Sequence, residues 1–242
     1  MDTTQGHIQS LEAYNPCMER ITANYGISLD GQTAFIEMAN ISGLPLIKKE
    51  QQNPMETTTY GTGELIRDAL ERGCQKFIVG IGGSATNDAG TGMLQALGFQ
   101  FLDKNGNVLG QGGKTLGKIT HVCTENVHKL LKKAHFIVAC DVQNPFYGPN
   151  GAAAVYARQK GADDNMIEKL DQGMCSFSQV IQQTTGKDIS QIPGSGAAGG
   201  MGGGMLAFFN AELRSGADLL LELSQFESKI GNADLIITGE GR

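Results

Sequence analysis

The sequence lacks the surplus of basic residues that marks nucleic-acid-binding proteins and proteins of anionic membrane surfaces. Its 19 Lys and Arg residues are outnumbered by 25 Asp and Glu residues, which gives a net charge of −6 at pH 7. A surface of either kind normally presents a cluster of basic side chains. The sequence also lacks any apolar run near the ~20 residues of a membrane span, and no basic and apolar leader opens it. We therefore expect no nucleic-acid partner and no membrane partner.

Cysteine is scarce and never closely spaced. The cysteines are odd in number, scattered and free of any C-x-x-C pair. They are Cys17, Cys74, Cys123, Cys140 and Cys175. This pattern favours neither a disulfide framework nor a zinc site. Reduced thiols are typical of cytoplasmic proteins, so we expect a cytoplasmic location.

Internal repeats and low-complexity linkers are also absent, whereas glycine is abundant. The chain has 34 glycines among 242 residues, roughly twice the ~7% of average usage. Most of them lie in a few runs. With 40% apolar residues, the chain can bury the core of one large α/β domain or of two small ones.

Short β-branched runs alternate with longer stretches at helical spacing. The runs predict buried strands at residues 33–38, 76–81, 135–140, 218–223 and 234–238. One helix is expected after the N-cap Thr62 with a stop at Gly73, and a longer one over residues 163–182. Asn105-Gly106 between apolar runs indicates a hairpin. We therefore predict an α/β fold with a mixed, largely parallel sheet and helices on both faces.

Both ends of the sequence are unlike those of a complete domain. Residues 1–25 are polar and weakly patterned, with no strand that feeds a glycine turn. The last residues are an expected strand and the loop after it, without a helix to return over the sheet. We expect a partial chain in three parts. These are residues 1–30 as the edge of a first, discontinuous domain or a non-native start, 31–230 as a middle α/β domain, and 231–242 as a truncated re-entry into the first domain.

Two glycine runs resemble nucleotide motifs without their context. The run GSGAAG at residues 194–199 matches the dinucleotide pattern G-x-G-x-x-G, but the residues before it, DISQIP, cannot form the strand that this motif needs. The run GGKT at residues 112–115 resembles the end of a P-loop, but Val108 occupies the position of the leading glycine. We expect neither a Rossmann site nor a P-loop.

A third glycine run, VGIGGSATNDAGTGM at residues 79–93, has the right context for anion binding. It follows an expected strand and precedes a helical pattern with Met93, Leu94 and Leu97 on one face. The free amides at a helix start attract anions, and glycines let an anion come close. The alternative is a tight turn in which Asn87 or Asp88 caps the helix. The local pattern leaves both interpretations open.

Around this run the sequence resembles the bacterial-type class I glycerate kinases. The resemblance runs in order from about residue 25 to residue 242. The segments that carry it are residues 57–103, 139–162, 193–223 and 233–242. It implies a two-domain α/β kinase that phosphorylates D-glycerate from ATP with Mg²⁺, giving 2-phosphoglycerate. Family members begin with a strand and a lysine-containing D-S-F-K-G type loop, which nothing before Tyr25 matches, so we expect no or very weak turnover from this chain.

Kinase chemistry requires a phosphate cradle, a metal and an acceptor hydroxyl in line. We assign the cradle to Gly82, Gly83, Ser84, Ala85, Thr86 and Asn87. Asp141 ends an expected strand, where it can accept the hydroxyl proton or hold the metal. The alternative for Asp141 is a cap of the loop around Asn144-Pro145. Asp88 and Glu240 are further catalytic candidates.

Glycerate carries a carboxylate, for which arginine or lysine is the natural partner. The candidates are Lys160, Arg158 and Arg242. Thr58 and Thr59 can donate to substrate oxygens. Gly196, within the run of residues 194–204, can contribute to a second anion nest, whereas close packing of backbone against backbone is the alternative.

Three function classes follow from these observations. The first is a glycerate kinase or its core. The second is a catalytically silent fragment that binds an anion or a partner protein. The third is an NAD-dependent oxidoreductase, which needs the missing strand before GSGAAG. Uncovered sheet faces at the two ends would favour self-association, so a homo-oligomer is a further expectation.

Overall fold

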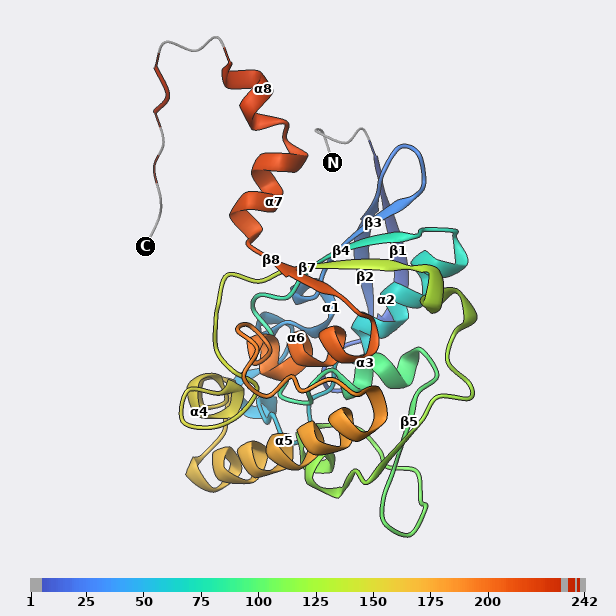
Figure 1. The fold of residues 1–242 in the computed structure, drawn as a ribbon, viewed down its shortest axis with the longest axis vertical. Coiled ribbons are helices and arrows are strands. Elements are labelled where there is room, and N and C mark those ends of the chain that lie inside the picture. Colours follow the sequence, from blue (N-terminus) through green and yellow to red (C-terminus); the bar gives the residue numbers. More distant parts are fainter. Residues whose placement is uncertain (1–5, 232–234, 238, 240–242) are drawn as a thin grey trace.

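A mixed β-sheet forms the centre of the protein in the computed structural model, which describes residues 6–231, 235–237 and 239 (Figure 1). Within these residues the sheet has six strands in the order β1-β2-β3-β4-β7-β8. The pairs β1-β2 and β2-β3 are antiparallel, and β3, β4, β7 and β8 run parallel. The strands are β1 (His7–Tyr14), β2 (Arg20–Ile27), β3 (Thr33–Glu37), β4 (Lys76–Gly80), β7 (His135–Ala139) and β8 (Glu212–Arg214).

Helices connect the parallel strands. The α-helices are α1 (Ala39–Ser42), α2 (Tyr60–Glu71), α3 (Thr91–Ala96), α4 (Ala152–Tyr156), α5 (Asp164–Thr185), α6 (Ala197–Phe208), α7 (Gly216–Leu223) and α8 (Phe226–Ile230). Short 3-10 helices are η1 (Leu44–Leu46), η2 (Lys49–Gln51), η3 (Gly113–Lys118), η4 (Lys129–Lys133) and η5 (Arg158–Lys160). None of the helices in the described part of the chain is long and apolar enough to cross a membrane.

The core lies on one face of the parallel strands. Phe77 pairs with Phe136 in the register of β4 and β7, and their rings stack at 4.6 Å between centroids. Both residues are buried, whereas Ile78 and Ile137 on the other face are only half-buried. Figure 1 shows α3, α5 and α6 on one side of β4, β7 and β8, and α7 and α8 on the other. The predicted α/β class with a mixed, largely parallel sheet is confirmed.

The predicted strands at 33–38, 76–81 and 135–140 correspond to β3, β4 and β7. The strand predicted at 218–223 is wrong, because these residues belong to helix α7. The Ser215 side chain accepts the amide hydrogen of Asp218 and so caps the helix. Leu219 is buried while Leu220 is 69% exposed. An unbroken run of leucines has neither the helical nor the strand period of hydrophobicity. The cap at Ser215 is the local feature that favours a helix.

The strand predicted at 234–238 lies partly outside the described residues. Residues 235–237 are described and belong to no strand, while 234 and 238 lie outside the described part.

The expectation of a weakly patterned start at residues 1–25 missed two strands. β1 and β2 pair along their whole length and join the sheet beside β3. Ala13, Ala23 and Tyr25 face the core, but most other residues of the two strands are exposed. A strand with one solvated face carries few apolar residues, so its pattern is weak. The division into three domain parts remains a prediction.

The two predicted helices form with small shifts in their bounds. α2 begins at Tyr60 with Thr59 as the N-cap residue, so Thr62 lies inside the first turn and not at the cap. Gly73 follows the C-cap with a φ of +96°, as expected for a helix stop. α5 is capped by the Asp163 side chain and ends three residues later than predicted, at Thr185.

The turn predicted at Asn105-Gly106 is formed. Gly106 has a φ of +80° and donates to the carbonyl of Asp103 at 3.0 Å. Leu102 and Val108 form an isolated antiparallel bridge across it. The two short strands of the second sheet, β5 (Gln100–Leu102) and β6 (His121–Cys123), pair antiparallel with each other.

Candidate active site

A cleft of about 230 Å³ opens at the carboxyl ends of β4 and β7. Ligands of open α/β sheets bind at this edge. The lining residues come from the loop after β4, the loop after β7, the segment that ends at Lys160, and the start of α6. They are Ile81, Gly82, Gly83, Ser84, Ala139, Cys140, Asp141, Val142, Tyr156, Gln159, Lys160, Ala197 and Ala198. The fold therefore brings together Gly82, Gly83, Ser84, Asp141 and Lys160, which are distant in sequence.

The loop after β4 turns at Gly83, which has a φ of +69°. Glycine adopts this left-handed conformation without strain. Two hydrogen bonds of 2.9 Å hold the loop, from the Leu44 amide to the Gly83 carbonyl and from the Ala85 amide to the Ser42 carbonyl. The amides of Gly82 and Gly83 donate to no other described residue, and both glycines are exposed. An anion can therefore approach these two amides directly.

The other three predicted cradle residues lie beneath the cleft. Ala85, Thr86 and Asn87 are fully buried. The Thr86 carbonyl accepts a hydrogen bond from Lys160, and Asn87 Nδ2 lies 3.2 Å from the sulfur of Met174. Ala85, Thr86 and Asn87 thus support the loop from inside, and Gly82, Gly83 and Ser84 form its surface.

Lys160 is buried although it carries an ammonium group. Only 2% of the residue is exposed. Its Nζ donates to Ser84 Oγ and to the Thr86 carbonyl, each at 2.7 Å. Burial lowers the pKa of Lys160 to about 7, an effect that the negative charge of Asp88 partly opposes. The charge at this end of the cleft therefore changes close to neutral pH.

Asp141 follows β7 and lines the same cleft. Its Oδ1 accepts the amide hydrogen of Gly216 at 2.8 Å, at the start of α7. A Cβ at Gly216 would lie 2.9 Å from Asp141 Oδ2, so the missing side chain leaves room for the carboxylate. No described residue donates a hydrogen bond to Oδ2. Asp141 thus caps α7, not the loop at Asn144, and keeps one oxygen for a ligand.

Asp88 forms its hydrogen bonds with other residues inside the protein. It is fully buried and accepts hydrogen bonds from the amides of Thr59, Gly90 and Gly92 and from the hydroxyl of Thr59. Burial raises the pKa of Asp88, although these hydrogen bonds oppose the shift. Thr58 and Thr59 are also fully buried, and none of the three residues lines the cleft. Their predicted catalytic and substrate roles stay predictions, while their visible contacts fasten the starts of α2 and α3.

The glycine run at 194–204 packs backbone against backbone. A Cβ at Gly196 would lie 2.1 Å from the Pro145 carbonyl oxygen, and one at Gly199 would lie 2.1 Å from that of Thr86. A Cβ at Gly204 would lie 2.4 Å from the Ala89 carbonyl oxygen. These contacts favour the packing interpretation of Gly196. The run presents only Ala197 and Ala198 to the cleft, the latter with a left-handed φ of 53°.

Of the three remaining predicted site residues, Arg158, Glu240 and Arg242, only Arg158 lies in the described part of the chain. Arg158 forms an exposed ion pair with Asp164 and does not line the cleft. Glu240 and Arg242 lie outside the described residues. Of the two cationic candidates that the structure describes, Lys160 reaches the cleft and Arg158 does not.

The sequence profile of the glycerate kinase family matches residues 1–242. The chain belongs to the glycerate kinase family. It is 44% identical over 242 residues to a glycerate kinase from Halalkalibacterium halodurans, which covers 100% of this chain and 64% of that protein. It is 46% identical over 239 residues to a glycerate 2-kinase from Escherichia coli, which covers 99% and 63%. A crystal structure assigned to glycerate kinase 2 of Salmonella typhimurium LT2 matches with a TM-score of 0.95 and 45% identity over 100% of this chain and 64% of that chain.

These matches confirm the resemblance to glycerate kinases and correct its extent. The similarity begins at residue 1 and not near residue 25, so β1 and β2 belong to the family's chain. This glycerate kinase family chain spans about 64% of the length of the curated relatives it matches.

Sequence reasoning missed two residues of this cleft. Tyr156 and Gln159 line it beside Lys160. The Tyr156 hydroxyl donates to Asn144 Oδ1 at 2.5 Å, which connects α4 to the loop after β7. Tyr156 lies four residues before Lys160, a helical spacing that could have identified it, and Gln159 directly precedes Lys160.

Glu37 is an acidic residue that the sequence analysis did not single out. It ends β3 beside Gly80, where a Cβ would lie 2.4 Å from Glu37 Oε2. The residue as a whole is exposed, but burial of its carboxyl raises the pKa of Glu37. An acid at the end of a buried strand is the signal that also identified Asp141.

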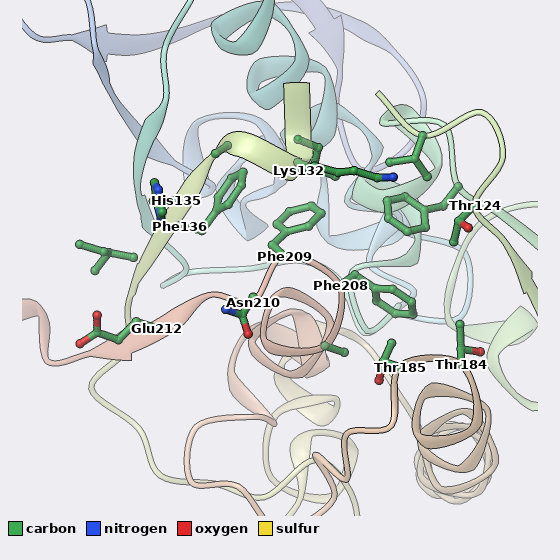
Figure 2. Close-up of a pocket in the computed structure, with 16 residues that line it drawn as sticks. Thr124, Lys132, His135, Phe136, Thr184, Thr185, Phe208, Phe209, Asn210 and Glu212 are labelled. Atoms are coloured by element: carbon green, nitrogen blue, oxygen red, sulfur yellow. The ribbon is translucent and has the colours of Figure 1, made fainter. Parts of the chain in front are cut away.

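A larger cavity, of about 700 Å³, lies where β7 and β8 begin, at the other end of these strands (Figure 2). Two aromatic pairs line it, Phe99 with Phe208 at 5.4 Å and Phe136 with Phe209 at 4.6 Å between ring centroids. No sequence-predicted site residue in the described part of the chain lines this cavity. The amides of Gly82 and Gly83, which donate to no described residue, lie at the smaller cleft.

A protein-only metal cage is absent from the described part of the chain, which contains no group of three or more His, Cys, Asp or Glu residues placed to hold an ion. Mg²⁺ in phosphate-transferring enzymes is usually held by one or two carboxylates together with substrate phosphates. Asp141 with its open Oδ2 suits such a site.

Proposed function

We propose that the protein is the core of an enzyme that transfers the γ-phosphoryl group of ATP to a hydroxyl of D-glycerate, giving 2-phosphoglycerate, and that this chain by itself turns over weakly or not at all. The observation that carries the proposal is the single cleft in which two unpaired glycine amides, the ammonium group of Lys160 and the carboxylate of Asp141 meet. Membership of the glycerate kinase family supports the same reaction.

The glycine loop is suited to the nucleotide phosphates. Phosphoryl transfer needs positioning and charge neutralisation more than covalent chemistry from the protein. In the proposal the amides of Gly82 and Gly83 and the hydroxyl of Ser84 contact phosphate oxygens, and buried Ala85, Thr86 and Asn87 keep the loop rigid. Asp88 accepts hydrogen bonds from Thr58 and Thr59 and from the start of α3, and so fixes the helix that follows this loop.

Asp141 is assigned to the reacting hydroxyl or to the metal. Its Oδ1 is held by the Gly216 amide, which fixes the direction of the free Oδ2. A carboxylate in that position can accept the hydroxyl proton as a general base. Mg²⁺, when bound, would neutralise phosphate charge, and Asp141 is the residue that would hold it.

The carboxylate of glycerate requires a cation. Lys160 is the candidate that lines the cleft, and Arg158, Arg242 and the Gly196 nest remain further candidates from the sequence. The oxidoreductase alternative is not favoured, because a loop and not a strand precedes the run GSGAAG at residues 194–199.

The cellular setting that fits this function is the cytoplasm. All five cysteines are free, which suits a reducing compartment. Self-association remains an expectation, and light scattering of the purified chain tests it.

A coupled assay of ADP release with ATP, Mg²⁺ and D-glycerate tests the function, together with calorimetric binding of Mg-ADP and of D-glycerate. Saturable binding of both ligands, lost or weakened at least about tenfold in Asp141→Asn, supports the proposal. Asp30→Asn is the matched control, because Asp30 lies in the exposed turn between β2 and β3. Absence of turnover together with absence of binding of either ligand would overturn it.

A further inference from the structure

The contact between Lys160 and Ser84 has a direction that follows from hydrogen-bond chemistry. An ammonium group has three donors and no acceptor. In the 2.7 Å contact between Nζ and Ser84 Oγ, a protonated Lys160 therefore donates and Ser84 accepts. The hydroxyl hydrogen of Ser84 has to point elsewhere.

The cleft is the direction that remains for this hydrogen. Ser84 is only 7% exposed, but it lines the cleft. No described residue accepts a hydrogen bond from its hydroxyl. The second contact of Nζ, with the Thr86 carbonyl at 2.7 Å, fixes the ammonium group behind the loop. The Ser84 hydroxyl thus lies next to the two unpaired amides of Gly82 and Gly83 with its hydrogen free for a ligand.

We propose that Lys160 is a positioning residue that makes Ser84 a fixed hydrogen-bond donor to an oxyanion in the cleft, alongside the amides of Gly82 and Gly83. The inference rests on the proposed function, in which this cleft takes the nucleotide phosphates and the glycerate carboxylate. Both groups present the same chemistry, and separate ligands distinguish them. Lys160 acts through Ser84 and does not need to touch the ligand.

Deprotonation of Lys160 would reverse the contact. A neutral amine can accept the Ser84 hydrogen, and the donor to the ligand is then lost. Burial lowers the pKa of Lys160 to about 7, so this reversal falls near neutral pH, and a bound oxyanion raises the pKa again by attraction. The other ionisable groups around the ammonium are Asp88 behind it and Cys140, Asp141 and Tyr156 in the cleft.

Calorimetric titration of the full chain with inorganic phosphate, Mg-ADP and D-glycerate between pH 6 and pH 9 tests the inference. For the wild type we expect the affinity for the ligand that uses Ser84 to fall as the pH rises through the range in which Lys160 loses its proton. Ser84→Ala should lower that affinity about tenfold at pH 6, the loss expected for one charge-assisted hydrogen bond, and should flatten the pH profile. Ser84→Thr keeps the hydroxyl and should retain the profile.

Combining the substitutions separates positioning from direct attraction. Lys160→Met leaves the Ser84 hydroxyl in place but no longer fixes its hydrogen, so it should weaken binding by no more than Ser84→Ala does. The double variant should bind no more weakly than Ser84→Ala, because without the hydroxyl there is no donor for Lys160 to position. If Ser84→Ala keeps the pH profile, or if the two effects add, Lys160 acts directly on the ligand and the inference is overturned. Since Lys160→Met leaves the Thr86 carbonyl without its donor and could fail to fold, Ser84→Ala and the wild-type profile are sufficient by themselves.

Failure of the inference is distinguishable from failure of the proposed function. Wild-type binding that Ser84→Ala leaves unchanged refutes the role of the pair alone. Absence of wild-type binding of all three ligands refutes the oxyanion site and the proposed function with it.

Discussion

The carboxylate of Asp88 accepts the amide hydrogen of Thr59 at 2.8 Å and that of Gly92 at 3.2 Å. One buried side chain therefore joins the start of α2 to the start of α3, directly beneath the glycine loop. The close approach of the two segments depends on Gly92, where a Cβ would lie 2.0 Å from Thr58 Oγ1.

Replacement of Asp88 is expected to destabilise the fold. Asp88→Ala leaves the amides of Thr59, Gly90 and Gly92 without their acceptor in a fully buried site, which should lower the free energy of unfolding by about 3 kcal/mol. Urea unfolding measures the change. Asp30→Ala, at an exposed turn, is the control and should change stability by less than about 1 kcal/mol. A small effect of Asp88→Ala would mean that water replaces the carboxylate.

Stability should depend on pH through Lys160. Its pKa is lowered to about 7 in the folded protein from 10.5. Between these values the unfolded chain binds more protons than the folded one, so the free energy of unfolding rises as the pH increases from about 7 toward 10.5. Urea unfolding at several pH values should show this rise for the wild type relative to Lys160→Met. Parallel curves for the two proteins would contradict the lowered pKa of the buried lysine.

Gly199 should tolerate no side chain. Gly199→Ala places a Cβ 2.1 Å from the Thr86 carbonyl oxygen at a φ of +68°. Gly31→Ala is a close control, because Gly31 has a φ of +70° but nothing within 4 Å. The control should lose about 1 kcal/mol from backbone strain alone, and Gly199→Ala should lose at least about 2 kcal/mol more because the backbones must separate. Equal losses measured by thermal or urea unfolding would refute the packing role of the run.

Gly82 should matter for binding and not for stability. A Cβ at Gly82 meets nothing within 4 Å, so Gly82→Ala should fold normally, but its methyl group would stand beside the exposed amides of the loop. Phosphate or Mg-ADP affinity should fall about tenfold in calorimetry, because the anion can no longer approach the amides closely. Gly110→Ala, also in open space, should bind as the wild type does. An unchanged affinity of Gly82→Ala would exclude the loop as an anion site.

Much of the site could be predicted from local pattern. Gly82 and Gly83 follow a buried strand, and Asp141 follows another, so their meeting at one sheet edge is a consequence of parallel pairing. Lys160 was identifiable as a cation, but its burial behind Ser84 was not, because the contact spans 76 residues. The roles of Thr58, Thr59 and Asp88 stay predictions for the same reason. Their polar side chains suit a site or a buried network equally well in sequence.

The errors in the fold have a similar cause. Leucines at 219–221 fit a strand or a helix, and only the cap at Ser215 and the burial of Leu219 alone among them select α7. In the hairpin of β1 and β2, one solvated face removes the alternation that marks a strand. In both places local composition is compatible with two structures.

The sequence by itself determined the family, through four segments in family order, and the parallel strands β3, β4 and β7, because each strand depends on residues close together in the chain. Only the tertiary structure decided which polar groups face the cleft and which form hydrogen bonds inside the protein. No described residue uses Asp141 Oδ2 or the hydroxyl hydrogen of Ser84, whereas Asp88 bonds to Thr59 and Lys160 gives two of its three donors to Ser84 and Thr86. The reason is physical: a buried polar group must find its partners within the fold, and those partners come from segments far apart in sequence.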